Sequence, residues 1–421
     1  MVRRIQIAQG ITLLAAQTQK FKTGCFSVNF LRPHSKEDAA MDALLPSVLL
    51  RATQNYPDIA SISSRLDELY GASFGTLVRL KGEVKTIGFY ADFIEDVFLP
   101  EGEQVFAPMV EFLQEVLYRP YLEEGIFAKR CVEGEKQNLI HAIEAARNDK
   151  RVYAAQRLRQ IMCENEAYSV PRLGYREDVE IITPEALWEH YHEVLANSRI
   201  LLFYAGRQSP EAAAEQFGKI FQDNGREETV RVHTDVIREA KELREVRESM
   251  DISQGKLAIG LRTGVTTEEE SYAALVLLNA VYGSGMTSKL FLNVREKLSL
   301  CYYVGSALEK YKGLMLISSG IDSKDYEQAK EAILGELEAC RKGEITQEEL
   351  ESARRSVLSA LRASMDAPAR LDDYYIGKAI AGGDDIEALA EKIAVLTRED
   401  LVRVAQRCSL DTIYFLKGEE L

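Results

Sequence analysis

The chain has 421 residues, more than a single hydrophobic core ordinarily organises, so two or more domains are expected. Hydrophobic residues make up 46% and charged residues 28% of the composition, as in soluble globular proteins. The net charge of −14 argues against a general affinity for nucleic acid or anionic membranes, and no apolar run reaches the roughly 20 residues of a membrane span. The six cysteines form no CxxC pair, which favours a reducing cytoplasm over a disulfide or zinc framework.

The first 19 residues, MVRRIQIAQGITLLAAQTQ, predict a β-hairpin, because Gln6, Gln9 and Gly10 leave too short an apolar core for a signal peptide. A strand, FSVNFLRP, follows, and after it comes DALLPSVLLRAT (residues 42–53), an apolar helical pattern with a proline and a serine in its middle. A proline inside a helix costs roughly 3 kcal/mol, because it lacks the N–H donor and clashes with the preceding turn. This segment therefore has a low helix propensity at its centre and carries no reactive side chain there.

Two copies of one pattern of elements follow each other along the chain. Residues 182–206 and 396–418 each begin with a threonine N-cap, Thr183 or Thr397, continue as an amphipathic helix and end in a β-rich strand. Upstream, the strand FSVNFLRP matches KLAIGLRTG in the same way. Repeats of nearly 200 residues are too long for a solenoid and predict a duplicated domain.

The repeat sets the expected domains. Residues 1–222 are predicted to form the first domain, 223–248 a polar and charge-dense linker, and 249–421 the second domain. Each copy mixes strands and helices without regular βαβ alternation. The predicted fold class is therefore α+β, with two homologous α/β-roll domains, each a mixed and largely antiparallel sheet packed by helices.

Few residues are typical of a catalytic or metal site. His190 and His192 are two apart on a predicted helix and do not share a face, whereas helical zinc pairs are usually four apart. We expect this pair on a half-exposed helix surface, and His34 and His141 in structural roles. No GxSxG or Walker A sequence occurs, and the glycine-rich YGSGMTSKLF (282–291) predicts a flexible turn that opens a helix rather than a phosphate cradle.

Two stretches, RLDELYGASF (65–74) and SKLFLNVREKLSLCYYVGSALEKYKGLMLISSGID (288–322), lie one in each half of the chain. Together with the duplication and the charged linker, they resemble the M16 family of metallopeptidases, the group of pitrilysin and the mitochondrial processing peptidase. The resemblance covers nearly the whole chain and implies two homologous domains in a clamshell arrangement. In that family an HxxEH helix in the first half supplies two zinc-binding histidines and a general-base glutamate, and a later helix supplies a third ligand, a glutamate.

In this sequence the first histidine position holds Ala43, the glutamate position Pro46 and the second histidine position Ser47. In the later motif, EKQNLIHA, Glu135 remains at the start but Ala142 holds the ligand position. Alanine has no lone pair, a serine hydroxyl is a poor zinc ligand, and proline cannot take up a proton. The resemblance therefore implies no catalytic residue, no metal and no cofactor in this chain.

The spacing leaves one alternative open. The interval from Ser47 to Ala142 is longer than is usual in the family, so Glu123, Glu124 and Glu135 are candidates for a displaced ligand. Without the two histidines, such a ligand would not complete a zinc site.

The second half keeps more of the family's pattern. Arg295 and Tyr302 match the arginine and tyrosine of the R-E-x-x-x-L-x-Y stretch, whose side chains in active members reach across the clamshell to bound substrate. The resemblance implies that they bind peptide, and an arginine suits this role as a permanent cation with five donors. The other interpretation is that both side chains are buried and hold the glycine-rich turn in place.

The resemblance implies a noncatalytic subunit of a heteromeric zinc peptidase. It would give chamber walls and peptide contacts to a catalytic M16 partner, which alone would carry zinc. The alternative is a stand-alone peptide- or protein-binding module, as a monomer or a homodimer. A third hypothesis is an unrelated enzyme that uses His190, His192 and nearby acids. A peptide or protein substrate, a cytoplasmic location and no nucleic-acid or membrane partner are expected.

Overall fold

The computed structural model describes residues 2–221 and 229–418. Its contacts divide these residues into two compact units, which interleave along the sequence. The first unit is drawn from Met1–Glu144, Val170–His233 and Asp366–Ile380, and the second from Ala145–Ser169, Thr234–Met365 and Ala381–Leu421. The predicted domains, 1–222 and 249–421 with a linker at 223–248, follow the two copies of the repeat along the sequence. That division stays a prediction.

The described part of the first unit contains a six-stranded sheet in the order β1-β2-β8-β3-β5-β4. Its strands are β1 (Arg3–Ala8), β2 (Ile11–Gln17), β3 (Thr23–Pro33), β4 (Ser73–Lys81), β5 (Val84–Ile94) and β8 (Arg199–Gly206). Neighbouring strands pair antiparallel, except that β2 and β8 are parallel. The antiparallel pair of β1 and β2 confirms the hairpin predicted at the start of the chain.

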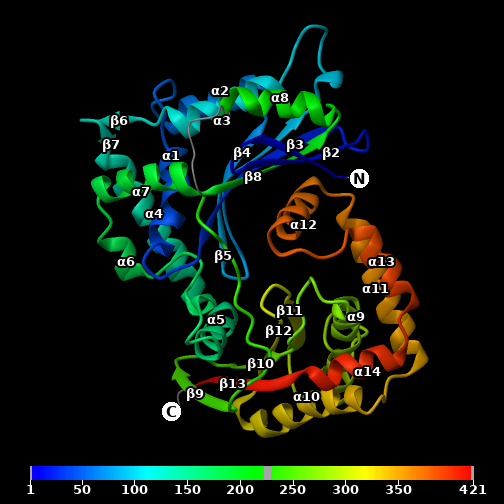
Figure 1. Cartoon of the computed structure of the whole chain (residues 1–421). Coiled ribbons are helices and arrows are strands. Elements are labelled where there is room, and N and C mark those ends of the chain that lie inside the picture. The colour runs from blue at the N-terminus through cyan, green and yellow to red at the C-terminus, as the bar shows by residue number, and fades with distance from the viewer. Residues whose placement is uncertain (1, 222–228, 419–421) are drawn as a thin grey trace. The chain divides into compact units, whose positions relative to one another are not determined.

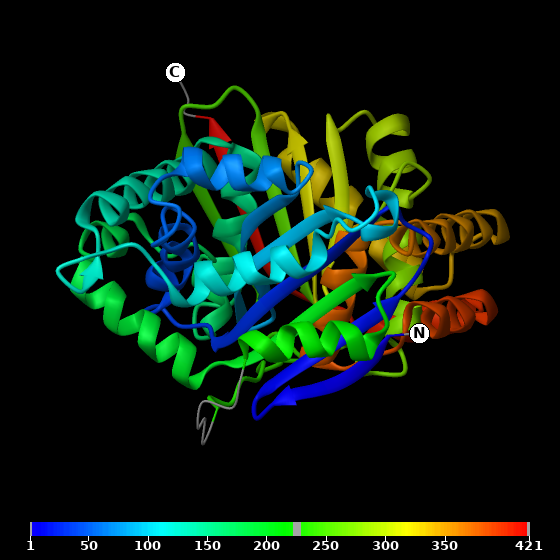
Figure 2. The ribbon, with the colours of Figure 1, turned by 90° about the horizontal axis from the view of Figure 1, so that it is seen from above.

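Helices cover both faces of the first sheet. They are α1 (Ala39–Leu49), α2 (Ile59–Glu68), α3 (Phe106–Tyr118), α4 (Lys129–Asn148), α6 (Arg176–Glu180), α7 (Pro184–Asn197), α8 (Pro210–Ile220) and α12 (Pro368–Ala381), with the short η1 (Asp96–Phe98) and the small pair β6 (Leu122–Glu123) and β7 (Ile126–Phe127). The helices α3 and α8 lie side by side over one face (Figures 1 and 2).

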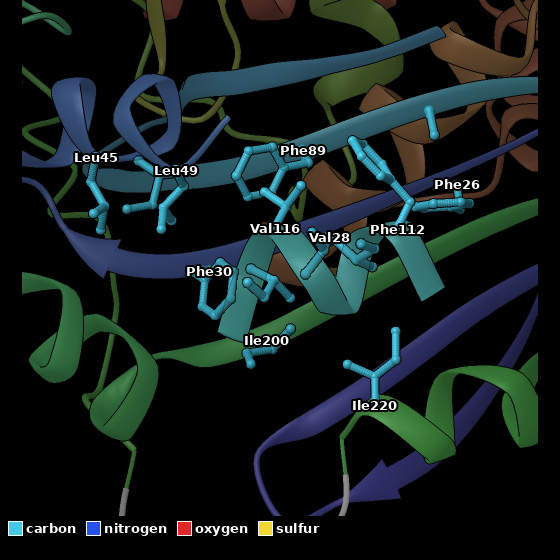
Figure 3. Close-up of a cluster of buried hydrophobic side chains, with 14 of the residues drawn as sticks. Phe26, Val28, Phe30, Leu45, Leu49, Phe89, Phe112, Val116, Ile200 and Ile220 are labelled. Carbon is cyan, nitrogen blue, oxygen red and sulfur yellow. The ribbon is translucent and has the colours of Figure 1, made fainter. Parts of the chain in front are cut away.

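The core of the first unit fills the space between this face and the helices. Every second residue of β3 points into it, because side chains alternate across a strand. Figure 3 shows the resulting cluster, which includes Phe26, Val28 and Phe30 of β3, Phe112 and Val116 of α3, and Leu45 and Leu49 of α1. Packing against β4, β5 and α7 fixes the position of α1, the helix with the internal proline.

The described part of the second unit contains a five-stranded sheet in the order β11-β12-β10-β13-β9. Its strands are β9 (Arg244–Met250), β10 (Gly255–Arg262), β11 (Tyr303–Glu309), β12 (Leu314–Ile321) and β13 (Ser409–Gly418). Around it lie α5 (Lys150–Met162), η2 (Ala167–Ser169), α9 (Tyr272–Tyr282), η3 (Leu290–Lys297), η4 (Ser323–Asp325), α10 (Tyr326–Arg341), α11 (Gln347–Ser364), α13 (Ile386–Val395) and α14 (Arg398–Arg407).

The two sheets repeat one topology, as a duplication predicts. Five strands of the first sheet, β2-β8-β3-β5-β4, correspond in order and direction to β9-β13-β10-β12-β11, including the single parallel pair at one end. The predicted caps are also present: Thr183 Oγ1 accepts from Ala186 N, and Thr397 forms a capping box with Asp400. The predicted α+β class, with mixed and largely antiparallel sheets packed by helices, is confirmed.

Each sheet is completed by a helix from the other half of the chain. In the first unit α12 packs against the second face, where Asp372 Oδ1 accepts from Ser27 Oγ at 2.5 Å and Asp372 Oδ2 from Arg79 Nη1 at 2.6 Å. In the second unit α5 packs against β10 and β13, with Leu158 in a buried cluster beside Tyr414. The compact units are thus not the two contiguous copies of the repeat.

The predicted linker is partly structured. Residues 223–228 lie outside the described residues, and residues 244–248 belong to β9, which pairs in parallel with β13. Within the described residues, no helix has the length and the apolar character that a membrane span requires.

Candidate functional site

The helix α1 holds three positions that the resemblance assigns to the zinc site: the two histidine positions and the general-base position. Ala43 and Pro46 are buried in the core of the first unit, and Ser47 is partly exposed. The helix runs on through Pro46, and Leu50 N donates to Pro46 O. Since proline has no N–H, the bond from residue 46 to the carbonyl of Asp42 cannot form. Packing against the sheet therefore maintains a helix that its own sequence disfavours.

Pro46 borders a small apolar cavity of about 10 Å³. Its lining also includes Phe30, Leu45, Leu49 and Tyr191. A cavity with this apolar lining offers a reacting water no polar partners. The position that holds the general base in the resemblance thus faces hydrocarbon in this chain.

The third ligand position is equally unsuited. Ala142 is exposed on α4, and Glu135, about two turns before it, has its Oε1 2.8 Å from Arg51 Nη1. The other two candidates for a displaced ligand, Glu123 and Glu124, are exposed near the β6–β7 turn, where Glu123 lies 3.6 Å from Arg130.

The residues present do not fit zinc. Ala43, Ser47 and Ala142 supply no imidazole, carboxylate or thiolate. Among residues 2–221 and 229–418, no group of three or more His, Cys, Asp or Glu side chains could hold a metal ion. No zinc-dependent step can therefore be derived from this chain's own residues.

A buried polar network beside α1 escaped the sequence analysis. Asp42 Oδ1 lies 2.9 Å from His190 Nε2 and 3.4 Å from Arg32 Nε, and all three side chains are buried. Arg32 also pairs with Glu193 at 2.8 Å and with Asp38 at 3.2 Å. The network joins β3, α1 and α7, so it sets how α1 sits in the unit.

The two neighbouring histidines of α7 have different surroundings. His190 is buried against Asp42, which corrects the expectation of a half-exposed position, whereas His192 is exposed beside the ring of Trp188. His34 is buried with its Nε2 3.0 Å from Val170 O, which is a structural role, and burial lowers its pKa. His141 is exposed on α4.

The glycine-rich turn in the second unit opens a helix, as predicted, but the helix is unusual. The segment η3 (Leu290–Lys297) is a π-helix, in which Leu298 N donates to Asn293 O, five residues earlier, at 3.0 Å. Such helices are rare and are frequent at functional sites. Sequence periodicity gave no sign of it, because each π-helical hydrogen bond spans only one residue more than an α-helical one, over a segment of eight residues.

Arg295 lies on this π-helix with its side chain 40% exposed. Its guanidinium lies over the ring of Phe291, 4.7 Å from the centroid, and its Nε is 3.6 Å from Glu296 Oε1. The ring orients the cation from one side, and an exposed ion pair with a neighbouring residue is weak. The guanidinium can therefore exchange this partner for a carbonyl or carboxylate of a ligand.

Tyr302, just before β11, is 61% exposed. Its hydroxyl donates to Asp322 Oδ1 at 3.2 Å, and this hydrogen bond raises the pKa of Tyr302. The group therefore remains a protonated hydroxyl at neutral pH, and it can donate to a ligand when its one hydrogen leaves Asp322. The exposure of Arg295 and Tyr302 does not fit the interpretation in which both are buried supports of the turn.

Comparisons with known proteins identify the family of this chain. Residues 182–357 match the family description "Peptidase M16 inactive domain". The chain is 33% identical over 412 residues to the "Probable inactive metalloprotease YmfF" of Bacillus subtilis (strain 168), covering 98% of this chain and 96% of that protein. The chain belongs to the M16 peptidase family. Because the YmfF relative is described as a probable inactive metalloprotease, and the positions that the resemblance assigns to the zinc ligands and the base hold Ala43, Pro46, Ser47 and Ala142, it is a noncatalytic M16 member.

Solved structures share the fold of this chain. A conserved protein from Enterococcus faecalis V583 superposes with a TM-score of 0.89 at 29% identity, covering 99% of each chain. A structure described as a peptidase M16 inactive domain from Pseudomonas fluorescens superposes with a TM-score of 0.80 at 17% identity, covering 100% of this chain and 98% of that one. The second similarity concerns the fold alone.

Proposed function

We propose that this M16 chain is the noncatalytic subunit of a heteromeric zinc peptidase, to which it contributes chamber walls and peptide contacts. The observation that carries the proposal is an asymmetry between the halves. The positions for zinc and its water hold Ala43, Pro46, Ser47 and Ala142, whereas Arg295 and Tyr302 are kept and exposed in the second unit. Peptide-binding side chains without a metal site fit a subunit whose partner chain performs the cleavage. They also fit the alternative, a binding module that takes part in no cleavage.

The expected partner is an M16 chain with an intact HxxEH motif, which would hold the zinc of the complex. A permanent pairing would bury roughly 2,000 Å² or more. A cytoplasmic location belongs to this proposal. The six free cysteines, all buried, are compatible with such a reducing compartment.

Co-purification with such an M16 partner, followed by elemental analysis, tests the division of labour. We expect a stable heteromer with one zinc ion per catalytic chain, and no stoichiometric zinc in this chain alone. Zinc bound by the isolated chain would refute the noncatalytic assignment of its residues. An isolated chain that binds fluorescein-labelled casein, but associates with no M16 partner, would instead support a stand-alone binding module.

Replacing Arg295 with alanine tests the peptide contact. In the complex we expect kcat/KM for fluorescein-labelled casein to fall by about tenfold or more, because a charge-assisted hydrogen bond to the peptide is lost. The matched control is Lys297→Ala, which removes an exposed cation from the same π-helix. Equal kinetics for the two variants would remove Arg295 from the peptide-binding surface.

A further inference from the structure

The π-helix that carries Arg295 needs an explanation, because this winding is less favourable than an α-helix. It spans eight residues, Leu290–Lys297, and is followed at Ser299 by a left-handed backbone with φ of 54°. A non-glycine residue in that region is uncommon and carries a conformational cost. Contacts outside the segment must therefore hold it in this form.

Two polar tethers link the segment to neighbouring helices. Lys289, 7% exposed, places its Nζ 2.9 Å from Glu349 Oε1, and Glu349 also closes the capping box at the start of α11. Asn293 Nδ2 donates to Glu336 Oε1 on α10 at 2.9 Å. Burial raises the pKa of Glu336, opposed by the bond from Asn293 and the charge of Lys289. Both tethers are thus partly buried, and a hydrogen bond is stronger in such a low-dielectric setting than in water.

The second tether acts on the residue that defines the winding. The carbonyl of Asn293 accepts the bond from Leu298 N, and the side chain of the same residue holds α10. Leu290 and Val294 are fully buried and fix one side of the helix. If the segment were an α-helix instead, with each N–H bonded to the carbonyl four residues earlier, the Arg295 side chain would point in a different direction relative to Leu290 and Val294.

We infer that Asn293 is a positioning residue, which acts through Glu336 to hold residues 290–298 in the π-helix and so fixes where Arg295 presents its guanidinium to the peptide. The inference rests on the proposed function for its ligand, but the tether itself does not. Lys289 and Glu349 hold the start of the segment in the same way. The pre-set helix spares the chain the cost of ordering Arg295 when peptide binds.

The test compares four variants of the full chain: Asn293→Ala, Glu336→Ala, Glu336→Gln and Lys297→Ala. A glutamine at 336 keeps an oxygen that can accept from Asn293, whereas an alanine does not. We expect amide hydrogen exchange at Leu298 to become about tenfold faster in Asn293→Ala and Glu336→Ala, and to stay unchanged in Glu336→Gln and Lys297→Ala. Unchanged exchange at the buried Ile333 of α10 confirms that each variant is folded.

The same variants in the complex with the M16 partner report on function. We expect Asn293→Ala to raise KM for fluorescein-labelled casein by about tenfold with little change in kcat, because the reacting groups belong to the partner. Unchanged exchange at Leu298 in Asn293→Ala would overturn the tether. Faster exchange with unchanged KM, while Arg295→Ala still raises KM, would overturn the positioning role alone. If neither Asn293→Ala nor Arg295→Ala changes KM, the proposed peptide contact fails and the positioning role fails with it.

Discussion

Replacing Glu166 with alanine is expected to lower the free energy of unfolding of the second unit by about 3 to 5 kcal/mol, the range found when one partner of a buried ion pair is removed. The Glu166 side chain is 4% exposed, with Oε1 2.8 Å from Arg262 Nη2 and Oε2 2.6 Å from Lys312 Nζ. Both cations are themselves buried. The alanine variant removes the carboxylate that Arg262 and Lys312 share. One positive charge is then left buried without a compensating anion.

Glu164, two residues earlier, offers a matched control. Its side chain is exposed and lies 2.8 Å from Arg244 Nη1, so Glu164→Ala should cost less than about 1 kcal/mol. Urea denaturation followed by circular dichroism measures both variants, and hydrogen exchange in β10 assigns the loss to the second unit. Similar losses for the two variants would show that burial does not govern the strength of this ion cluster.

The same cluster predicts a pH dependence. Burial alone would raise the pKa of Glu166, but the contacts with Lys312 and Arg262 outweigh it and lower the pKa from its ordinary value of 4.5. A carboxylate with a lowered pKa stabilises the fold above its ordinary value, and this contribution is lost as the pH falls through the folded-state pKa. The stability difference between the wild type and Glu166→Gln should therefore shrink below about pH 4.5. A constant difference down to pH 3 would contradict the assignment.

Replacing Asp42 with alanine is expected to cost the first unit about 3 kcal/mol, because a charge-assisted bond and a buried ion pair are lost together. The Asp42 side chain is 0% exposed and serves both His190 and Arg32. Arg32 retains Glu193 and Asp38, which places the expected loss at the lower end for a buried pair. Denaturation, with hydrogen exchange in β3, measures the effect on the unit that contains α1.

Asp38 provides the control for Asp42, since it contacts the same arginine from a more exposed position. Its side chain makes no capping bond at the start of α1, so Asp38→Ala removes only the ion pair and should cost less than about 1 kcal/mol. A larger loss for Asp38→Ala than for Asp42→Ala would mean that the buried network does not hold α1.

Several features were predictable because they depend on local patterns. The first hairpin and the caps at Thr183 and Thr397 follow from short-range preferences that tertiary contacts did not override. The duplication was visible because both copies kept the same order of elements. The burial of His190 was mispredicted, since the partner that accepts it, Asp42, lies 148 residues away in the chain.

The sequence by itself determined that this M16 chain is noncatalytic, because the residues that the resemblance assigns to the zinc-ligand positions, Ala43, Ser47 and Ala142, carry no imidazole, carboxylate or thiolate. Tertiary structure alone decided that α12 covers a face of the first sheet and that α5 covers a face of the second. It also decided that Asn293 and Lys289 tether the π-helix that carries Arg295. These arrangements depend on contacts between segments far apart in the chain. Local periodicity carries no information about which distant partner satisfies a buried charge or covers a sheet.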